Sequence, residues 1–84
     1  MRKHEEMLTA ALAEVLGVDA DTLSPTRSFA EQGVDSLLGL RFARRVQDLA
    51  GAEFDAEWLF DHPSLRELAA FLAAQDAQAA AAAG

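Results

Sequence analysis

The chain has 84 residues, carries a formal net charge of −7 from 14 acidic and 7 basic residues, and contains no cysteine. A chain this short forms one domain and buries only about 60% of the surface that its unfolded form exposes. The missing thiols exclude disulfides and thiolate metal sites, and the acidic balance argues against nucleic acid as a partner. Without an apolar run of about 18 residues or a signal-peptide stretch, we expect no membrane association. The composition therefore predicts a small cytoplasmic domain, monomeric in isolation, that is stabilised by packing alone.

The first predicted helix covers residues 4–16, where apolar side chains recur at helical spacing from Met7 to Leu16. Gly17 follows at a position that suits a left-handed helix stop. A long connection then runs over residues 18–35, and within it Ser28 and Glu31 have the spacing of a capping box. A connection of this length is uncommon unless it is functional.

The second predicted helix covers residues 36–50, with Asp35 as its N-cap and Gly51 as its stop. At 100° per residue, one face collects Leu38, Phe42, Val46 and Leu49. The opposite face carries Leu37, Leu40, Arg41 and Arg44. A serine that only starts a helix gives no reason for two leucines to point outward beside it. We therefore interpret the face next to Ser36 as a candidate docking surface.

The rest of the chain predicts two further helices. A short helical turn is expected over residues 55–60 with Asp55 as its cap. A last helix is expected after Ser64, which has capping-box spacing to Glu67, and it should end near residue 75. The alanine-rich residues 75–84 are interpreted as a linker or truncated tail that follows a domain of residues 1–74. The predicted fold is an all-α bundle of three main helices and one short helix. Its expected core includes Phe29, Phe42, Val46, Leu49 and Leu68.

Ser36 has three possible roles. It could be a purely structural residue at a helix start, with the exposed leucines serving a helical protein-interaction module. It could be a hydrolase nucleophile paired with His62, but "GVDSL" is not the G-x-S-x-G elbow and no oxyanion-hole loop is evident. It could also accept a covalent group on a rigid helix surrounded by a docking surface, and the outward leucines favour this third role. His62 stands without a second ligand at metal spacing, so we expect no metal site.

The segments "FAEQGVDSL" and "LFDHPSLRELAAFL" resemble the phosphopantetheinyl carrier proteins, specifically the acyl carrier domains of modular polyketide synthases. The resemblance covers about residues 5–74. It implies a small carrier fold and a non-catalytic domain that holds acyl or polyketide intermediates as thioesters. It also implies that Ser36 is the attachment residue for 4'-phosphopantetheine, with coenzyme A as the donor. Asp35 and Leu37 match the flanking positions, and aspartate in place of the histidine usual in peptidyl carriers favours an acyl cargo.

The same resemblance implies partner proteins. A phosphopantetheinyl transferase would supply Mg²⁺ and the base, and later partners would be ketosynthase, acyltransferase and processing domains. The predicted partner-binding residues are Asp35, Leu37, Leu40, Arg41 and Arg44. Carrier domains often have glutamate where this chain has Arg41, so the recognition helix is basic here within an acidic protein. Phe42 stands where carriers specialised for β-branching often have tryptophan, so that specialisation is not expected.

Overall fold

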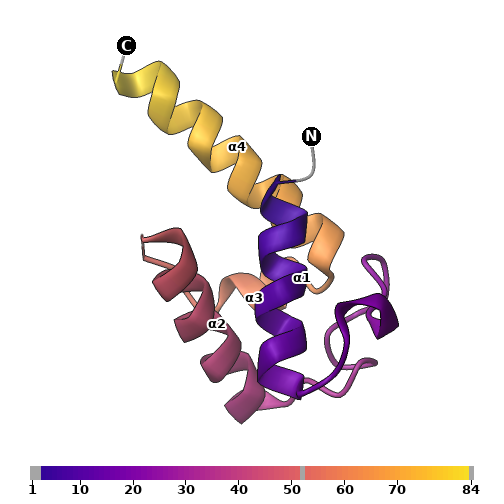
Figure 1. Ribbon diagram of the computed structural model, residues 1–84. Helices are drawn as coiled ribbons and strands as arrows, with labels where there is room; N and C mark the ends of the chain where they lie inside the picture. Colours follow the sequence, from indigo (N-terminus) through magenta and orange to yellow (C-terminus); the bar gives the residue numbers. More distant parts are fainter. Residues whose placement is uncertain (1–2, 52, 84) are drawn as a thin grey trace.

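The computed structural model describes residues 3–51 and 53–83. Its elements are α1 (Lys3–Leu16), the 3₁₀ turn η1 (Ala20–Thr22), α2 (Ser36–Ala50), α3 (Trp58–Asp61) and α4 (Leu65–Ala83). In Figure 1, α2 runs back alongside α1, and α4 leaves the body of the domain past the start of α1. Only an isolated bridge between Ser28 and Ser64 has β character in the described part of the chain. The predicted all-α fold with a long connection between the first two main helices is confirmed.

The two ends of α2 are fixed by the residues that the sequence predicted. The Asp35 carboxylate accepts a hydrogen bond of 2.8 Å from the backbone N–H of Leu38, which satisfies one donor of the first turn. Gly51 has a φ of 68°, in the left-handed region, and its N–H donates to the Gln47 carbonyl at 2.9 Å. Both capping interactions involve residues within four positions of the helix end. The places of Asp35 and Gly51 in the sequence therefore determine where α2 begins and ends.

The connection between α1 and α2 is held by local and by long-range hydrogen bonds. The predicted Ser28–Glu31 capping box is reciprocal, because each backbone N–H donates to the other side chain, at 3.2 and 3.1 Å. Farther along, the N–H of Phe29 donates to the Pro63 carbonyl at 2.8 Å, and the N–H of Arg66 donates to the Pro25 carbonyl at 2.9 Å. The first bond fastens the connection to the junction between α3 and α4, and the second fastens it to the first turn of α4.

The core lies where α1, α2 and α4 meet, and the connection and α3 complete it. Its largest fully buried side chains are Leu8, Leu12, Phe42, Val46, Leu65 and Leu68. Phe29 is buried as predicted and lies against Phe42, with 5.6 Å between ring centroids. The prediction for Leu49 is wrong, since 45% of this residue is exposed. Leu49 borders an open hollow between the last turn of α2 and the start of α1, where Lys3, His4 and Met7 also lie, so nothing covers it fully.

The second half of the chain differs from the prediction in its helix bounds. The short helix begins at Trp58 rather than near Asp55, whose carboxylate instead accepts from the N–H of Glu57 at 2.9 Å in the preceding turn. The last helix continues through Ala83, past the predicted end near residue 75, because alanine has the highest intrinsic helix preference. A contact of 2.6 Å between His4 Nε2 and Asp76 Oδ2 links this extension to α1. The division into residues 1–74 and 75–84 stays a prediction.

Candidate functional site

Ser36 is the first residue of α2 and is exposed. The Asp35 cap holds it at the point where the connection turns into the helix, so its hydroxyl stands on a rigid element. Backbone N–H groups of a first helical turn lack intrahelical partners, and together with the helix dipole they favour a negatively charged group such as phosphate. The position therefore fits a phosphate ester on the serine oxygen.

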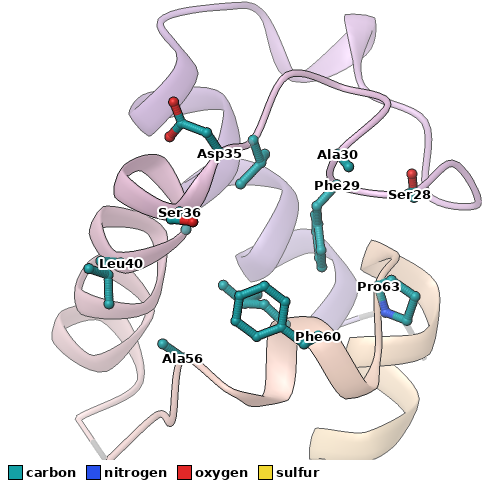
Figure 2. Close-up of a pocket in the computed structure, with 12 residues that line it drawn as sticks. Ser28, Phe29, Ala30, Asp35, Ser36, Leu40, Ala56, Phe60 and Pro63 are labelled. Atoms are coloured by element: carbon teal, nitrogen blue, oxygen red, sulfur yellow. The ribbon is translucent and has the colours of Figure 1, made fainter.

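An apolar cavity of about 340 Å³ opens directly beside Ser36, between the start of α2, the connection and α3 (Figure 2). Its lining consists of Ser28, Phe29, Ala30, Val34, Asp35, Ser36, Gly39, Leu40, Ala56, Leu59, Phe60 and Pro63. The three polar members all belong to the connection or to the α2 start. The other nine lining residues are apolar, so the cavity offers burial to an apolar group attached at Ser36.

Two residues of the cavity wall are large, apolar and exposed. Leu40 of α2 is 59% exposed and Phe60 of α3 is 76% exposed. Figure 2 shows Phe60 standing at the cavity, with Leu40 and Ser36 on the neighbouring turns of α2. Sequence reasoning missed Phe60, because the exposure of its side chain depends on the burial of Leu59, which the sequence does not show. In a helix of only four residues that buries Leu59, the next residue must point to another side.

Gly39 forms the part of the wall that α2 contributes between Ser36 and Leu40. A Cβ atom at this position would lie 3.4 Å from Leu59 Cδ1 and 3.9 Å from Val34 Cγ1. Both distances are those of ordinary van der Waals contact. The glycine is therefore compatible with tight packing of α3 against α2, and it also leaves room in the cavity that any side chain would occupy.

The predicted outward face of α2 is exposed as expected. Leu37 is 59% exposed, like Leu40, and Arg41 and Arg44 extend the same face. Arg45 differs, because its Nε lies 2.7 Å from Glu14 Oε2, and that hydrogen bond raises the pKa of the Arg45 guanidinium. Within the described residues, Arg41 and Arg44 make no ion pair, so their charges are directed to solvent.

The alternative chemistries find no support in this geometry. His62, the candidate base of the hydrolase reading, stacks on Phe71 at 4.2 Å between ring centroids and is not part of the wall beside Ser36. No group of three or more potential metal ligands occurs among the described residues. None of the helices in the described ranges is both long and apolar enough to cross a bilayer.

The geometry defines a class of protein, namely a small helical domain that presents a modifiable serine at a helix start beside an apolar cavity. The family model described as "Phosphopantetheine attachment site" matches residues 6–72, and the chain belongs to this family. Its sequence is 35% identical over 66 residues to the polyketide synthase PksL of Bacillus subtilis, which covers 79% of this chain and 2% of that protein. The chain thus spans a small fraction of the curated relative's length.

Two solved structures are similar in fold. A free-standing peptidyl carrier protein from Acinetobacter baumannii has a TM-score of 0.79 and 25% identity, with 86% of this chain and 90% of that chain covered. The type II acyl carrier protein BlmI from Streptomyces verticillus, involved in bleomycin biosynthesis, also has a TM-score of 0.79, with 27% identity and 88% and 87% coverage. Since an acyl and a peptidyl carrier match equally well, the fold alone does not distinguish the two cargo types.

These findings confirm the class that the sequence predicted. The chain is a non-catalytic carrier domain of the kind found in polyketide synthases, and its family carries a covalently attached 4'-phosphopantetheine. A thiol at the end of that arm holds intermediates as thioesters. The alternative of a helical interaction module without an arm is not favoured.

Proposed function

We propose that Ser36 carries the 4'-phosphopantetheine arm, and that the domain presents acyl or polyketide intermediates to the catalytic domains of a polyketide synthase in the cytoplasm. The observation that carries this proposal is the exposed hydroxyl at the first position of α2, beside an apolar cavity. Among the described residues, no other exposed hydroxyl side chain lies at the first position of a helix of eight or more residues. Ser64 precedes α4 but is buried.

We expect that the chain does not activate Ser36 by itself. A serine hydroxyl is a weak nucleophile unless a base lies within hydrogen-bond reach, and the neighbouring Asp35 carboxylate is already engaged at the Leu38 N–H. We therefore expect a separate transferase to supply the base and Mg²⁺. The serine oxygen would attack the phosphorus atom that bears the pantetheine of coenzyme A. The bond from that phosphorus to the adenosine bisphosphate portion would break, and the serine proton would pass to the base of the transferase.

The outward face of α2 is proposed as the surface that the transferase and the ketosynthase, acyltransferase and processing domains contact. It consists of Asp35, Leu37, Leu40, Arg41 and Arg44. The exposed leucines would supply apolar contact at the centre, and the arginines would set orientation and favour partners with an acidic surface. This charge pattern is opposite to that of the chain as a whole, which carries −7.

Intact-mass measurement tests the attachment residue. After incubation with coenzyme A and a broad-specificity phosphopantetheinyl transferase, the wild-type domain should gain one phosphopantetheine and Ser36→Ala should gain none. The fold of Ser36→Ala should persist, because Asp35 remains the N-cap. Ser28→Ala is the matched control, since Ser28 also lines the cavity but lies in the connection, and it should still be modified. A gain of mass by Ser36→Ala would overturn the assignment, and no gain by the wild type would favour the interaction module.

A further inference from the structure

Arg41 and Arg44 of α2 differ from the other arginines in the described part of the chain, because neither forms an ion pair there. Each of the other three has a glutamate carboxylate within 3.9 Å, in the pairs Arg27–Glu31, Arg45–Glu14 and Arg66–Glu5. Both unpaired side chains are exposed. Two positive charges on one helix are therefore open to a ligand, in a protein whose net charge is −7.

The two arginines border an open hollow between α1 and α2 that has an excess of positive charge. Its lining consists of Glu14, Val15, Arg41, Arg44, Arg45 and Asp48, which places three guanidinium groups against two carboxylates. The Glu14 carboxylate is already engaged by Arg45. A guanidinium presents a planar fork of N–H donors, and residues at i and i+3 of a helix are neighbours. Two such groups side by side therefore suit an anion with several oxygens, such as a phosphate.

Helix geometry places this hollow within reach of chemistry at Ser36. With a rise of 1.5 Å per residue, Arg41 and Arg44 lie about 7.5 and 12 Å from Ser36 along the α2 axis. With 3.6 residues per turn, Arg44 is rotated by about 80° from Ser36, so the two side chains leave adjacent sides of the helix. A ligand with one end at Ser36 and an anionic group about 10 Å away can therefore lie along this side of α2.

The donor in the proposed arm transfer is a ligand with anionic groups beyond the reacting phosphorus. When the Ser36 oxygen forms its bond to the phosphorus that bears the pantetheine, the bond from that phosphorus to the bridging oxygen breaks. The electron pair stays on the departing adenosine 3',5'-bisphosphate, and the serine proton passes to the base of the transferase. The departing group gains negative charge at its 5'-phosphate and also carries the 3'-phosphate, a monoester with a charge of about −1.5 to −2 at pH 7.

We infer that Arg41 and Arg44 bind the 3'-phosphate of coenzyme A while the arm is attached to Ser36, so that this carrier contributes to the recognition of its own donor. The inference rests on the proposed attachment at Ser36. It gives the two arginines a ligand in the loading step, before they meet the acidic surfaces of later partners. The 3'-phosphate departs with the bisphosphate, so both side chains are open again once the arm is in place.

Loading from two donors that differ by one phosphate tests the inference. The full domain is incubated with a broad-specificity phosphopantetheinyl transferase and subsaturating coenzyme A or dephospho-coenzyme A, which lacks only the 3'-phosphate. Both donors deliver the same arm, and intact mass gives each loading rate. The ratio of the coenzyme A rate to the dephospho-coenzyme A rate cancels any contact of the arginines with the transferase itself. In Arg41→Gln and in Arg44→Gln this ratio should fall about five- to tenfold, because a charge-assisted hydrogen bond to the phosphate is lost.

Three control variants separate a phosphate contact from a general effect of charge or folding. Arg66→Gln removes an exposed arginine from α4 and should keep the wild-type donor ratio. Arg44→Lys and Arg41→Lys keep the charge without the planar fork and should recover part of the ratio. Glutamine and lysine have nearly the helix preference of arginine, so α2 should persist in each variant of the pair.

The outcomes that contradict the inference are distinct from failure of the attachment. A wild-type donor ratio in Arg41→Gln and Arg44→Gln would overturn the inference, as would an equal fall of the ratio in Arg66→Gln. Equal slowing with both donors would overturn it too, since the arginines would then contact the transferase alone. If the wild-type domain gains mass from neither donor, the attachment at Ser36 is wrong and the inference falls with it.

Discussion

The two faces of α2 contain similar residues and differ completely in their surroundings. Phe42 and Val46 face α1 and the connection and are almost fully buried, whereas Leu37 and Leu40 on the other face are 59% exposed. All four belong to one helix of 15 residues. The buried face contributes the free energy that folds the domain. The exposed face makes no comparable contribution, so its leucines are available to partners and to the arm proposed on Ser36. The apolar character of a helical residue therefore has to be interpreted together with its direction.

The largest expected effect concerns the buried face. Phe42→Ala should cost about 3–5 kcal/mol of unfolding free energy, because the ring is fully buried between Phe29 and Phe54. Against a total of about 5–15 kcal/mol for a typical domain, this loss can unfold the protein. Leu40→Ala, two residues earlier on the exposed face, should change stability by only about 0.5 kcal/mol. Urea titrations of the two variants measure both changes in unfolding free energy. Similar losses in the two variants would contradict the assignment of one buried and one exposed face.

The next effect concerns the exposed face and should be kinetic. Leu37→Asp should slow arm attachment and acyl transfer by about tenfold, because it places a charge in the proposed apolar contact. The melting temperature should hardly change, since Leu37 is exposed and an acidic residue in the first helical turn interacts favourably with the helix dipole. Val18→Asp, at an exposed apolar residue outside α2, should load at the wild-type rate. Wild-type rates for Leu37→Asp, or its unfolding, would contradict the proposed docking surface.

A smaller effect is expected from the charges on the same face. Arg44→Glu should slow transfer to the cognate ketosynthase several-fold at low salt and less at high salt. At 0.1 M ionic strength the Debye length is about 10 Å, and higher salt shortens it further. Arg66→Glu reverses an exposed arginine on α4 and should have a weaker effect. Transfer rates of the wild type and the variant are measured across a series of salt concentrations. If Arg44→Glu leaves the dependence of the transfer rate on salt unchanged, this charge does not guide docking.

The smallest effect lies outside α2, in the connection that leads to it. Hydrogen bonds from the Ser28 backbone, then from its hydroxyl, and the nearby Arg27 charge lower the pKa of Glu31 below its usual value of 4.5. A carboxylate with a lowered pKa contributes stability above its unfolded-state pKa, and this contribution is lost as pH falls through the folded-state pKa. The stability advantage of the wild type over Glu31→Gln should therefore be present at pH 7 and shrink below about pH 4.5. Because Glu31 is exposed, the advantage should be slight, and an advantage that grows on acidification would contradict this account.

Sequence reasoning succeeded where the controlling interactions are local. Asp35 and Gly51 mark the two ends of α2 through contacts within four residues. Their positions in the sequence were therefore sufficient to place both helix ends. The exposure of Leu37 and Leu40 also followed from helical phase alone. The role of Ser36 was inferred from a resemblance, and its chemistry stays a prediction.

The other errors concern Leu49 and the cavity, which depend on contacts between distant segments, and the end of α4, which depends on local helix preference. Leu49 has the helical phase of a core residue, but its burial depends on what the start of α1 places beside it. The cavity and Phe60 could not be predicted, because the wall is assembled from α2, α3 and the connection. The end of α4 was misplaced, since the loss of an amphipathic pattern was given more weight than the helix preference of alanine.

The two backbone hydrogen bonds that fasten the connection to the α3–α4 junction and to the start of α4 have a consequence for the folding and unfolding rates. They join Phe29 to Pro63 and Pro25 to Arg66, across more than thirty residues of intervening chain. Helices form in about a microsecond, whereas contacts between distant segments require closure of a long loop. We expect these contacts to form after the transition state for folding, so weakening them should mainly accelerate unfolding. The lifetime of the cavity wall beside Ser36 would then be set by how slowly these two hydrogen bonds break.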